Sequence, residues 1–389
     1  MTGGWSVKAL GDLFEISRGG SPRPIQDFLT EDVNGVNWIM ISDASASGKY
    51  IERTAKRIRP EGVARSRRVS PGDFLLTNSM SFGRPYIMKT EGCIHDGWLH
   101  LKKRDKSIDE QYFYHLLGSE ATYAKFERLA AGATVKNLNI DLVSKVEVPV
   151  PPLLEQRRIA TILDKADSLR RKRREALRLA DEFLKAVFFE RFAAKPRSRV
   201  LTDYCDFLAG FAFKSDQYIE PRDGVRLLRG INVGIDRFEW GASAGYPLGA
   251  VSDLTKYRLE KGDVVLAMDR PWISNGLKCA AVDEHVAGSY LVQRVARLRP
   301  KHQGMSAFIM NCLRGNDFKS HCRITETTIP HISPKDFATF PVPTTTDSEL
   351  HSFVDIATRI QRVATKAGLA AISTDELTSS LQATIFNMH

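Results

Sequence analysis

The longest regular pattern along the chain is a stripe of apolar residues between positions 154 and 192. Apolar side chains recur there every three or four positions, which is the spacing of one face of an amphipathic α-helix. A helix of that length is stable in water only when its stripe packs against another helix. A second stripe, over residues 347–386, is the candidate partner, and Gly368, Ser373 and Thr374 predict a break near its middle.

About 150 residues of mixed character precede each stripe. Short β-branched and aromatic runs, broken by Gly, Pro, Asn and Asp, are typical of strands in a loop-rich sheet. These runs occur at residues 36–42, 73–77, 262–268 and 289–298. Short helices are predicted at residues 109–118 and 306–313.

The chain repeats itself at a distance of about 190 residues. VPVP at 148–151 returns as FPVP at 340–343, and PGDFLL at 71–76 returns as KGDVVL at 261–266. LGD at 10–12 and GV at 35–36 return in the same order, as LTD at 201–203 and GV at 224–225. Four matches in one order at nearly one distance indicate an internal duplication, in which Asp12 and Asp203 belong to the shared framework.

Composition adds a preference for an anionic partner. The length of 389 residues suggests two or three domains, and 56 Lys+Arg against 46 Asp+Glu give a net charge of +10. Such an excess favours a polyanion such as nucleic acid. The 5 cysteines show no C-x-x-C pair, no signal peptide is visible, and no apolar run is long enough to span a membrane. We therefore expect a cytoplasmic protein.

One segment carries a family resemblance. VPVPPLLEQRRIA at 148–160 is a short proline stretch that leads into the first apolar stripe, and WSVKALGD at 5–12 and GDFLL at 72–76 accompany it. With these segments the chain resembles the specificity subunits of type I restriction-modification enzymes over nearly its whole length. The second half departs from the pattern at 344–347, where TTTD replaces a proline-rich segment with Gln.

The resemblance implies an α+β fold with an internal pseudo-twofold repeat. Two similar target recognition domains of mixed, loop-rich sheets are joined and spaced by two long antiparallel α-helices. The expected division is a recognition domain at 1–152, a central spacer helix at 153–195, a second recognition domain at 196–345 and a C-terminal helix at 346–389. Each domain is expected to read one half of a bipartite site in double-stranded DNA. The implied partners are two methyltransferase subunits and the restriction subunits.

Catalytic motifs are missing from the sequence. It contains no phosphate-binding P-loop, no dinucleotide fingerprint, no Asn-Pro-Pro-aromatic stretch of amino-methyltransferases and no His-Glu-x-x-His. His95, His100 and His115 do not have the spacing of a metal site. We therefore expect a non-catalytic subunit without cofactor or metal.

Two loops are the best candidates for reading bases: 77–86, after one predicted strand, and 268–275, in the matching place of the second half. Arg donates two hydrogen bonds to guanine, and Asn forms a matched pair with adenine. The alternative is that these loops only fold the domain, with Gly83 and Pro85 as turn residues. Including candidates for phosphate contact, the predicted DNA-binding residues are Arg18, Arg67, Arg68, Asn78, Ser79, Arg84, Lys214, Arg270, Trp272 and Asn275.

The first stripe supplies the predicted partner-binding residues, which are Ile159, Ile162, Leu163, Leu169, Leu177 and Leu184. Within it, LRRKRR at 169–174 has two interpretations. It is either a nucleic-acid patch or a solvated helix face, since consecutive residues spread around the whole helix.

Two other functions stay open on the sequence alone. One is a scaffold whose two sheet domains bind proteins, which the net charge and the Arg and Asn content of the loops disfavour. The other is a nuclease or methyltransferase with an unrecognised site, which the missing motifs disfavour.

Overall fold

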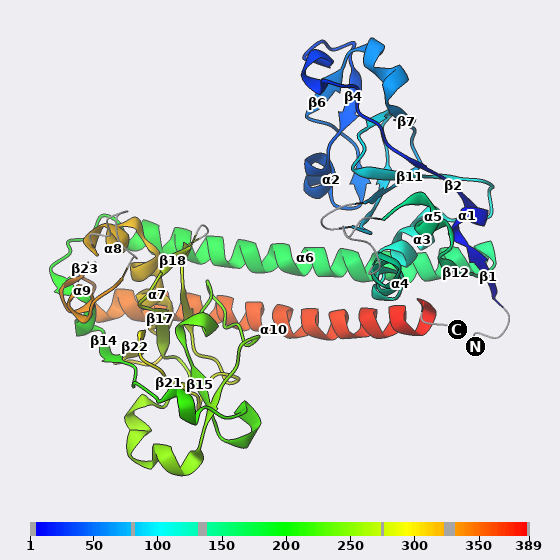
Figure 1. Cartoon of the computed structure of the whole chain (residues 1–389). Coiled ribbons are helices and arrows are strands. Elements are labelled where there is room, and N and C mark those ends of the chain that lie inside the picture. The colour runs from blue at the N-terminus through cyan, green and yellow to red at the C-terminus, as the bar shows by residue number, and fades with distance from the viewer. Residues whose placement is uncertain (1–4, 79–81, 131–137, 274–275, 323–330, 387–389) are drawn as a thin grey trace. The chain divides into compact units, whose positions relative to one another are not determined.

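The computed structural model describes residues 5–78, 82–130, 138–273, 276–322 and 331–386. The chain forms two compact units: the first joins the residues up to Arg173 with those from Leu369 onward, and the second runs from Arg174 to Gly368. Two long helices, α6 (Leu153–Phe192) and α10 (Asp347–Phe386), each contribute to both units (Figure 1). Within the described residues, no helix is both long enough and apolar enough to cross a membrane.

The first unit contains two mixed five-stranded sheets. One has the order β2 (Phe14–Arg18), β11 (Trp98–Lys103), β8 (Phe74–Thr77), β9 (Pro85–Met88) and β5 (Tyr50–Ile51). The other has the order β3 (Leu29–Thr30), β6 (Lys56–Ile58), β4 (Val36–Ile39), β10 (Gly92–Ile94) and β7 (Arg67–Val69). The unit also contains the antiparallel pair β1 (Ser6–Ala9) and β12 (Glu147–Val150), and the short α-helices α1 (Leu10–Leu13), α2 (Ile41–Ser47), α3 (Glu110–Leu117), α4 (Glu120–Ala130) and α5 (Ile140–Ser144).

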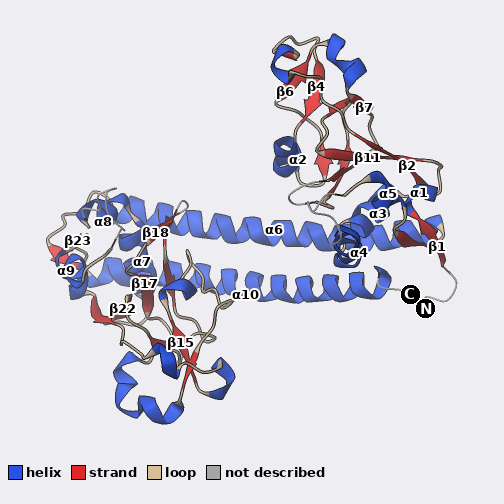
Figure 2. Cartoon of the chain, in the orientation of Figure 1, coloured by secondary structure: helices blue, strands red, loops and turns tan. Residues whose placement is uncertain are grey.

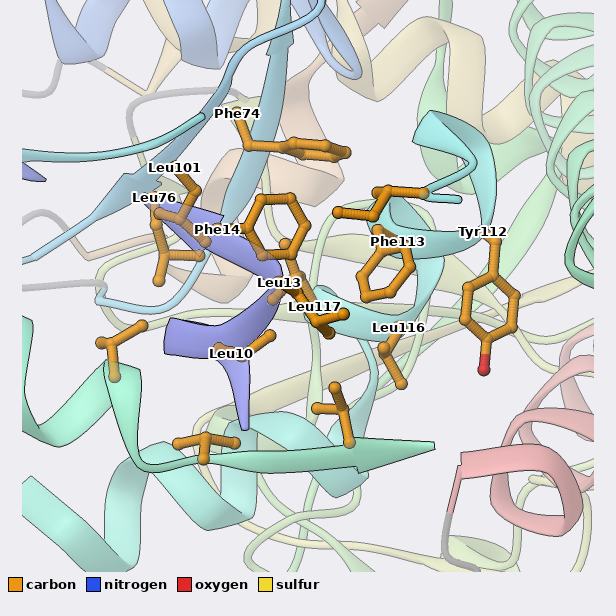
Figure 3. Close-up of a cluster of buried hydrophobic side chains, with 14 of the residues drawn as sticks. Leu10, Leu13, Phe14, Phe74, Leu76, Leu101, Tyr112, Phe113, Leu116 and Leu117 are labelled. Atoms are coloured by element: carbon orange, nitrogen blue, oxygen red, sulfur yellow. The ribbon is translucent and has the colours of Figure 1, made fainter. Parts of the chain in front are cut away.

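The main core of this unit joins the sheet to both long helices. The Phe14 ring lies against Phe74 and Phe113, with ring centroids 5.6 and 5.3 Å apart in edge-on arrangements (Figure 3). The same buried cluster includes Ile159 and Leu163 of α6 and Phe386 of α10. The apolar stripe is therefore stabilised by its own domain as well as by the partner helix.

The second unit repeats this plan with fewer strands, and Figure 2 shows that loops make up much of both sheet regions. One sheet has the order β14 (Cys205–Ala209), β22 (Val295–Pro300), β17 (Val264–Ala267) and β20 (Cys279–Ala281). The other has the order β16 (Gly245–Tyr246), β15 (Val225–Leu228) and β21 (Tyr290–Leu291). Two-residue strands form two further pairs, β13 (Arg199–Val200) with β23 (Pro341–Val342) and β18 (Trp272–Ile273) with β19 (Gly276–Leu277). The α-helices are α7 (Ser306–Arg314), α8 (Asn316–His321) and α9 (Pro334–Thr339).

The duplication predicted from the sequence recurs in the hydrogen bonds of the backbone. Gly19 N donates to Trp98 O and Gly210 N donates to Val295 O, both at 3.0 Å. In the same way, Gly72 N donates to Met88 O and Gly262 N donates to Val282 O, both at 2.9 Å. In both units the parallel strand pair, β4 with β10 and β15 with β21, is also retained.

The repeated Gly-Asp pair has the same structural role in both units. Gly72 and Gly262 have left-handed φ angles of 88° and 93°, which L-residues with a side chain rarely adopt. The carboxylate of the following Asp accepts a hydrogen bond from the backbone N–H three residues earlier, at 2.8 Å for Asp73 and 2.8 Å for Asp263. The motif thus closes a turn before a buried strand.

The two long helices pair antiparallel within each unit. In the first unit Arg170 of α6 forms an ion pair with Asp375 of α10. In the second, the Phe188 ring lies 5.7 Å from that of Phe353, and Lys195, just past α6, pairs with Glu349. Residue numbers rise along α6 as they fall along α10, so the predicted antiparallel pairing is confirmed.

Three predicted elements were wrong in detail. α10 is one continuous helix, because a single Gly costs a helix only about 1 kcal/mol and the partner helix offsets that cost. The strand predicted at 36–42 ends at Ile39, where α2 soon begins. The strand predicted at 289–298 is two strands, β21 and β22, because the chain crosses from one sheet to the other at residues 292–294.

Each sheet domain is also tied to α6 by ion pairs. In the first unit Asp164 of α6 accepts hydrogen bonds from Lys49 at 2.5 Å and from His115 at 2.8 Å. The His115 side chain is only 4% exposed. Burial lowers the pKa of His115, although its hydrogen bond to Asp164 opposes that shift. In the second unit Arg314 pairs with Asp181 of α6 at 3.4 Å.

Candidate nucleic-acid interface

A hollow of about 850 Å³ opens on the second unit, and most of the residues that line it are charged or polar. Five segments form it: the turn after β15, the β17–β18 connection, Lys278 between β19 and β20, the β21–β22 crossing, and His331 before α9. We call it the basic hollow. Its charged and amide side chains are Arg229, Asp269, Arg270, Lys278, Gln293, Arg294 and His331.

Asp269 organises the outer part of the basic hollow. Its Oδ2 accepts a hydrogen bond from Nη1 of Arg294, and its Oδ1 lies 2.7 Å from Nδ1 of His331. Burial opposes ionisation of this carboxyl, but the hydrogen bonds from Arg294 and His331 outweigh it and lower the pKa of Asp269. Since an ionised carboxylate only accepts hydrogen bonds, Nδ1 of His331 is the donor. Asp269 thus orients the side chains of Arg294 and His331 at the rim of the basic hollow.

Backbone conformation also distinguishes this rim. Arg270 and Arg294 have positive φ angles of 45° and 64°. Among the described non-glycine residues, Asp236 is the other one with a positive φ angle. Left-handed backbone at bulky residues costs energy and is concentrated at binding and active sites. Both arginines are exposed, and the Arg294 side chain is 70% exposed. The fold therefore presents two guanidinium groups to solvent from constrained turns.

Two further cations lie deeper. Lys278 donates to Gly230 O at 2.7 Å, and burial lowers its pKa. Arg229 donates to Ala242 O, and its guanidinium lies 5.9 Å from the Tyr218 ring. These two side chains hold the loops together and add positive charge to the basic hollow.

The matching place in the first unit carries different side chains. Thr77 N donates to Arg84 O as Ala267 N donates to Lys278 O, so Arg84 occupies the position of Lys278. Arg84 is exposed, with its guanidinium 5.4 Å from the Tyr86 ring.

The neighbouring predicted residues of the first unit converge on Asp96. Arg18 is exposed and donates from Nε to Asp96 O at 3.0 Å. Asn78 donates to the same oxygen at 2.8 Å, but its side chain is buried, so it holds the loop from inside. A hydrogen bond from Ser21 lowers the pKa of the Asp96 carboxyl.

The remaining predicted DNA-binding residues are dispersed. Arg67 and Arg68 are exposed on the edge strand β7, and Lys214 is exposed before a short 3₁₀ turn. Trp272 is half-buried, and its ring packs 6.0 Å from Phe318 at the second core. Ser79 and Asn275 lie outside the described residues. Of the second-half predictions that the structure describes, only Arg270 lines the basic hollow.

Sequence reasoning missed four basic side chains of the basic hollow: Arg229, Lys278, Arg294 and His331. Lys278 could have been predicted from the sequence, because an alignment of the two halves on their strands pairs it with Arg84. The other three come from segments far apart in the sequence, and only the fold brings them together.

The predicted partner-binding stripe divides into two sets. Ile159 and Leu163 are buried in the first core, and Leu184 packs against the second. Leu177 is half-exposed, whereas Ile162 and Leu169 are 44% and 48% exposed.

The basic run at 169–174 of α6 was interpreted either as a nucleic-acid patch or as a solvated helix face, and the structure divides its residues into two groups. Arg170 and Arg173 bind α10, through Asp375 and Thr374 respectively. The side chains of Arg171, Lys172 and Arg174 are exposed. Two members of the run therefore stabilise the helix pair.

Taken together, the fold defines a class: a duplicated, two-domain chain on paired long helices, with a basic hollow at the sheet loops of its second domain. Residues 2–179 match the family model described as the type I restriction modification DNA specificity domain. The chain is thus similar to the specificity subunits of type I restriction-modification systems, as the resemblance in its sequence implied.

Known relatives and solved structures are similar to this chain over different shares of its length. It is 25% identical over 338 residues to the type I restriction enzyme MjaVIII specificity subunit of Methanocaldococcus jannaschii, covering 81% of this chain and 76% of that protein. It is 32% identical over 141 residues to the EcoAI specificity subunit of Escherichia coli, covering 35% and 24%. The crystal structure of the S subunit of a type I system from M. genitalium has a TM-score of 0.59 and 14% identity, covering 98% of this chain and 96% of that one.

Proposed function

We propose that this chain is the sequence-specific DNA-binding subunit of a type I restriction-modification system. The observation that carries the proposal is the basic hollow, in which four basic side chains and His331 surround one acid on constrained loops. Guanidinium and ammonium groups neutralise phosphates, and guanidinium groups also read base edges in the major groove.

The target is a bipartite site in double-stranded DNA. The domain at 1–152 reads one half and the domain at 196–345 reads the other, while the helices at 153–195 and 346–389 act as a ruler between them. The duplicated framework supports this division, because two copies of one fold offer the same loops to two separate sequences.

The partners are two methyltransferase subunits and the restriction subunits, and this chain itself is not catalytic. Exposed apolar side chains on α6 support a docking role for that helix, since large apolar groups at the surface mark interaction sites. They include Phe183, which is 57% exposed, and Phe189, which is 72% exposed.

Two measurements test the proposal. The purified chain should bind duplex DNA, with an affinity that falls roughly tenfold or more between about 50 and 200 mM salt. When the chain is co-expressed with the modification subunits of its system, methylation should appear at one split sequence. Tight DNA-independent binding to a protein, with no affinity for DNA, would instead favour a protein scaffold.

The activity of the isolated chain is a third test. Purified alone, it should neither cut nor methylate DNA when given divalent metal or methyl donor. Methyl transfer that is lost on mutation of a residue in this chain would overturn the non-catalytic assignment.

A further inference from the structure

We propose that Arg294 reads a guanine in the half-site of the second domain, with Asp269 and His331 as the residues that position it. This inference rests on the proposed function, because it identifies the base that the basic hollow recognises. It is carried by the hydrogen bonds at the rim of the basic hollow and by the backbone of the β21–β22 crossing.

The first step concerns which donors of Arg294 are available. Its Nη1 is bound to Oδ2 of Asp269, and the structure gives the Nε and Nη2 groups no partner within the described residues. Nε and Nη2 form one edge of the planar guanidinium, with two parallel N–H donors. An exposed two-donor edge of this kind matches two adjacent acceptors.

The second step identifies the base. In the major groove guanine presents two neighbouring acceptors, N7 and O6. Adenine presents an acceptor beside an amino donor, and that donor would face an N–H of the guanidinium. Guanine is therefore the base that satisfies both free donors of Arg294.

The third step assigns Asp269 as a positioning residue. A free carboxylate accepts a hydrogen bond from the amino group of cytosine and would itself read DNA. Here both oxygens are occupied, Oδ2 by Arg294 and Oδ1 by His331. Holding the guanidinium in one orientation before binding reduces the entropy lost when the contact forms.

The fourth step limits the contact to one half-site. Met268 N donates to Arg294 O, and at the same point of the first unit Asn78 N donates to Gly97 O. The residue that corresponds to Arg294 is thus a glycine, which has no side chain to reach a base. The first domain must read its half-site in another way.

The experiment is selection from a randomised duplex library by the full chain, co-purified with the modification subunits of its system. The wild-type complex should enrich a split sequence with an invariant guanine at one position. In Arg294→Lys the charge is retained but the two-donor edge is lost. The preference for guanine over adenine at that position should then fall by a factor between about 5 and 150, with the other half-site unchanged.

Two variants separate positioning from folding and from bulk charge. Asp269→Asn leaves the loop in place but weakens the hold on Arg294, so it should reduce the same guanine preference by a smaller factor. Arg237→Ala removes an exposed arginine that pairs with Glu239 and does not line the basic hollow, so it should leave the selected sequence unchanged.

Specific outcomes would overturn the inference. If Arg294→Lys selects the wild-type sequence, or if Arg294→Ala weakens binding to all sequences equally, then Arg294 contacts phosphate and does not read guanine. If the wild-type complex enriches no sequence at all, the proposed function fails and the guanine reader fails with it.

Discussion

The two halves of this chain share a backbone framework and differ in the side chains that the framework presents. The Gly-Asp turn, the parallel strand pair, and the backbone hydrogen bonds of Gly19 and Gly210 recur in both halves. At the crossing itself the first half has Asp96 and Gly97, where the second has Gln293 and Arg294. Duplication has thus retained the hydrogen bonds that fold each domain, while the exposed positions between them have diverged.

A second difference lies in how each domain is attached to α6. In the first unit Asp164 is shared by Lys49 and the buried His115, whereas in the second Asp181 pairs with Arg314 of the sheet domain and with Lys185 of its own helix. The first attachment withdraws more charge from solvent and depends on more groups at once. The two attachments should therefore respond differently to mutation and to pH.

The largest expected effect tests the shared framework. A Cβ on Gly19 would stand 2.0 Å from His95 O, and one on Gly210 would stand 2.1 Å from Val292 O. Gly19→Val and Gly210→Val should each lower the free energy of unfolding by about 3 kcal/mol, because a backbone carbonyl must move. Denaturant unfolding of each variant measures this. Gly241→Ala, where nothing lies within 4 Å, is the control, and a tolerated valine at either position would break the equivalence of the halves.

The attachments to α6 should show a smaller and unequal effect. Asp164→Ala leaves Lys49 and His115 without their acceptor, and we expect a loss of about 2 kcal/mol in the free energy of unfolding. Asp181→Ala should cost about 1 kcal/mol, because Arg314 keeps its second partner, Asp236. The same unfolding measurement compares them, and equal losses would contradict the difference between the two attachments.

A still smaller effect is a pH dependence confined to the first unit. Because burial lowers the pKa of His115 in the folded chain, the unfolded chain binds a proton more readily. Stability from this site should be complete above the unfolded pKa, about 6.5, and should decline as pH falls below it. The charged groups around His115 are Lys49, Asp164 and Asp167. In His115→Gln the denaturant midpoint of unfolding should vary less with pH between about pH 6.5 and 5 than in the wild type. A pH dependence equal to that of the wild type would contradict the role of His115.

The sequence predicted the long elements better than the loops, for physical reasons. The stripe over 347–386 coincides with α10, because a periodic apolar face depends only on local spacing. The crossing at 292–294 was hidden within an apolar run, because which sheet each half of the run joins is decided by distant strands. Arg270 was found from its place after a strand, but Asp269, Arg294 and His331 meet only in three dimensions.

If the two domains read DNA as proposed, the spacing between them yields a further prediction that depends on α6. Inserting four residues after Ala176 lengthens a helix by about 6 Å and nearly completes a turn, so the apolar stripe stays close to its original phase. The unread spacer between the half-sites should then grow by one or two base pairs, at about 3.4 Å each, with both half-sites unchanged. A map of methylated sites shows the spacer length, and altered bases in either half-site would contradict a ruler.

The most direct test of the central claim, one reader in each half, is a domain exchange followed by a map of methylated sites. Residues 1–152 are replaced by the corresponding domain of another family member, and the chimera is co-expressed with the modification subunits. The account predicts that one half-site changes to that of the donor, while the other half-site and the spacer remain those of the wild type. A change in both half-sites, or in neither, would contradict it.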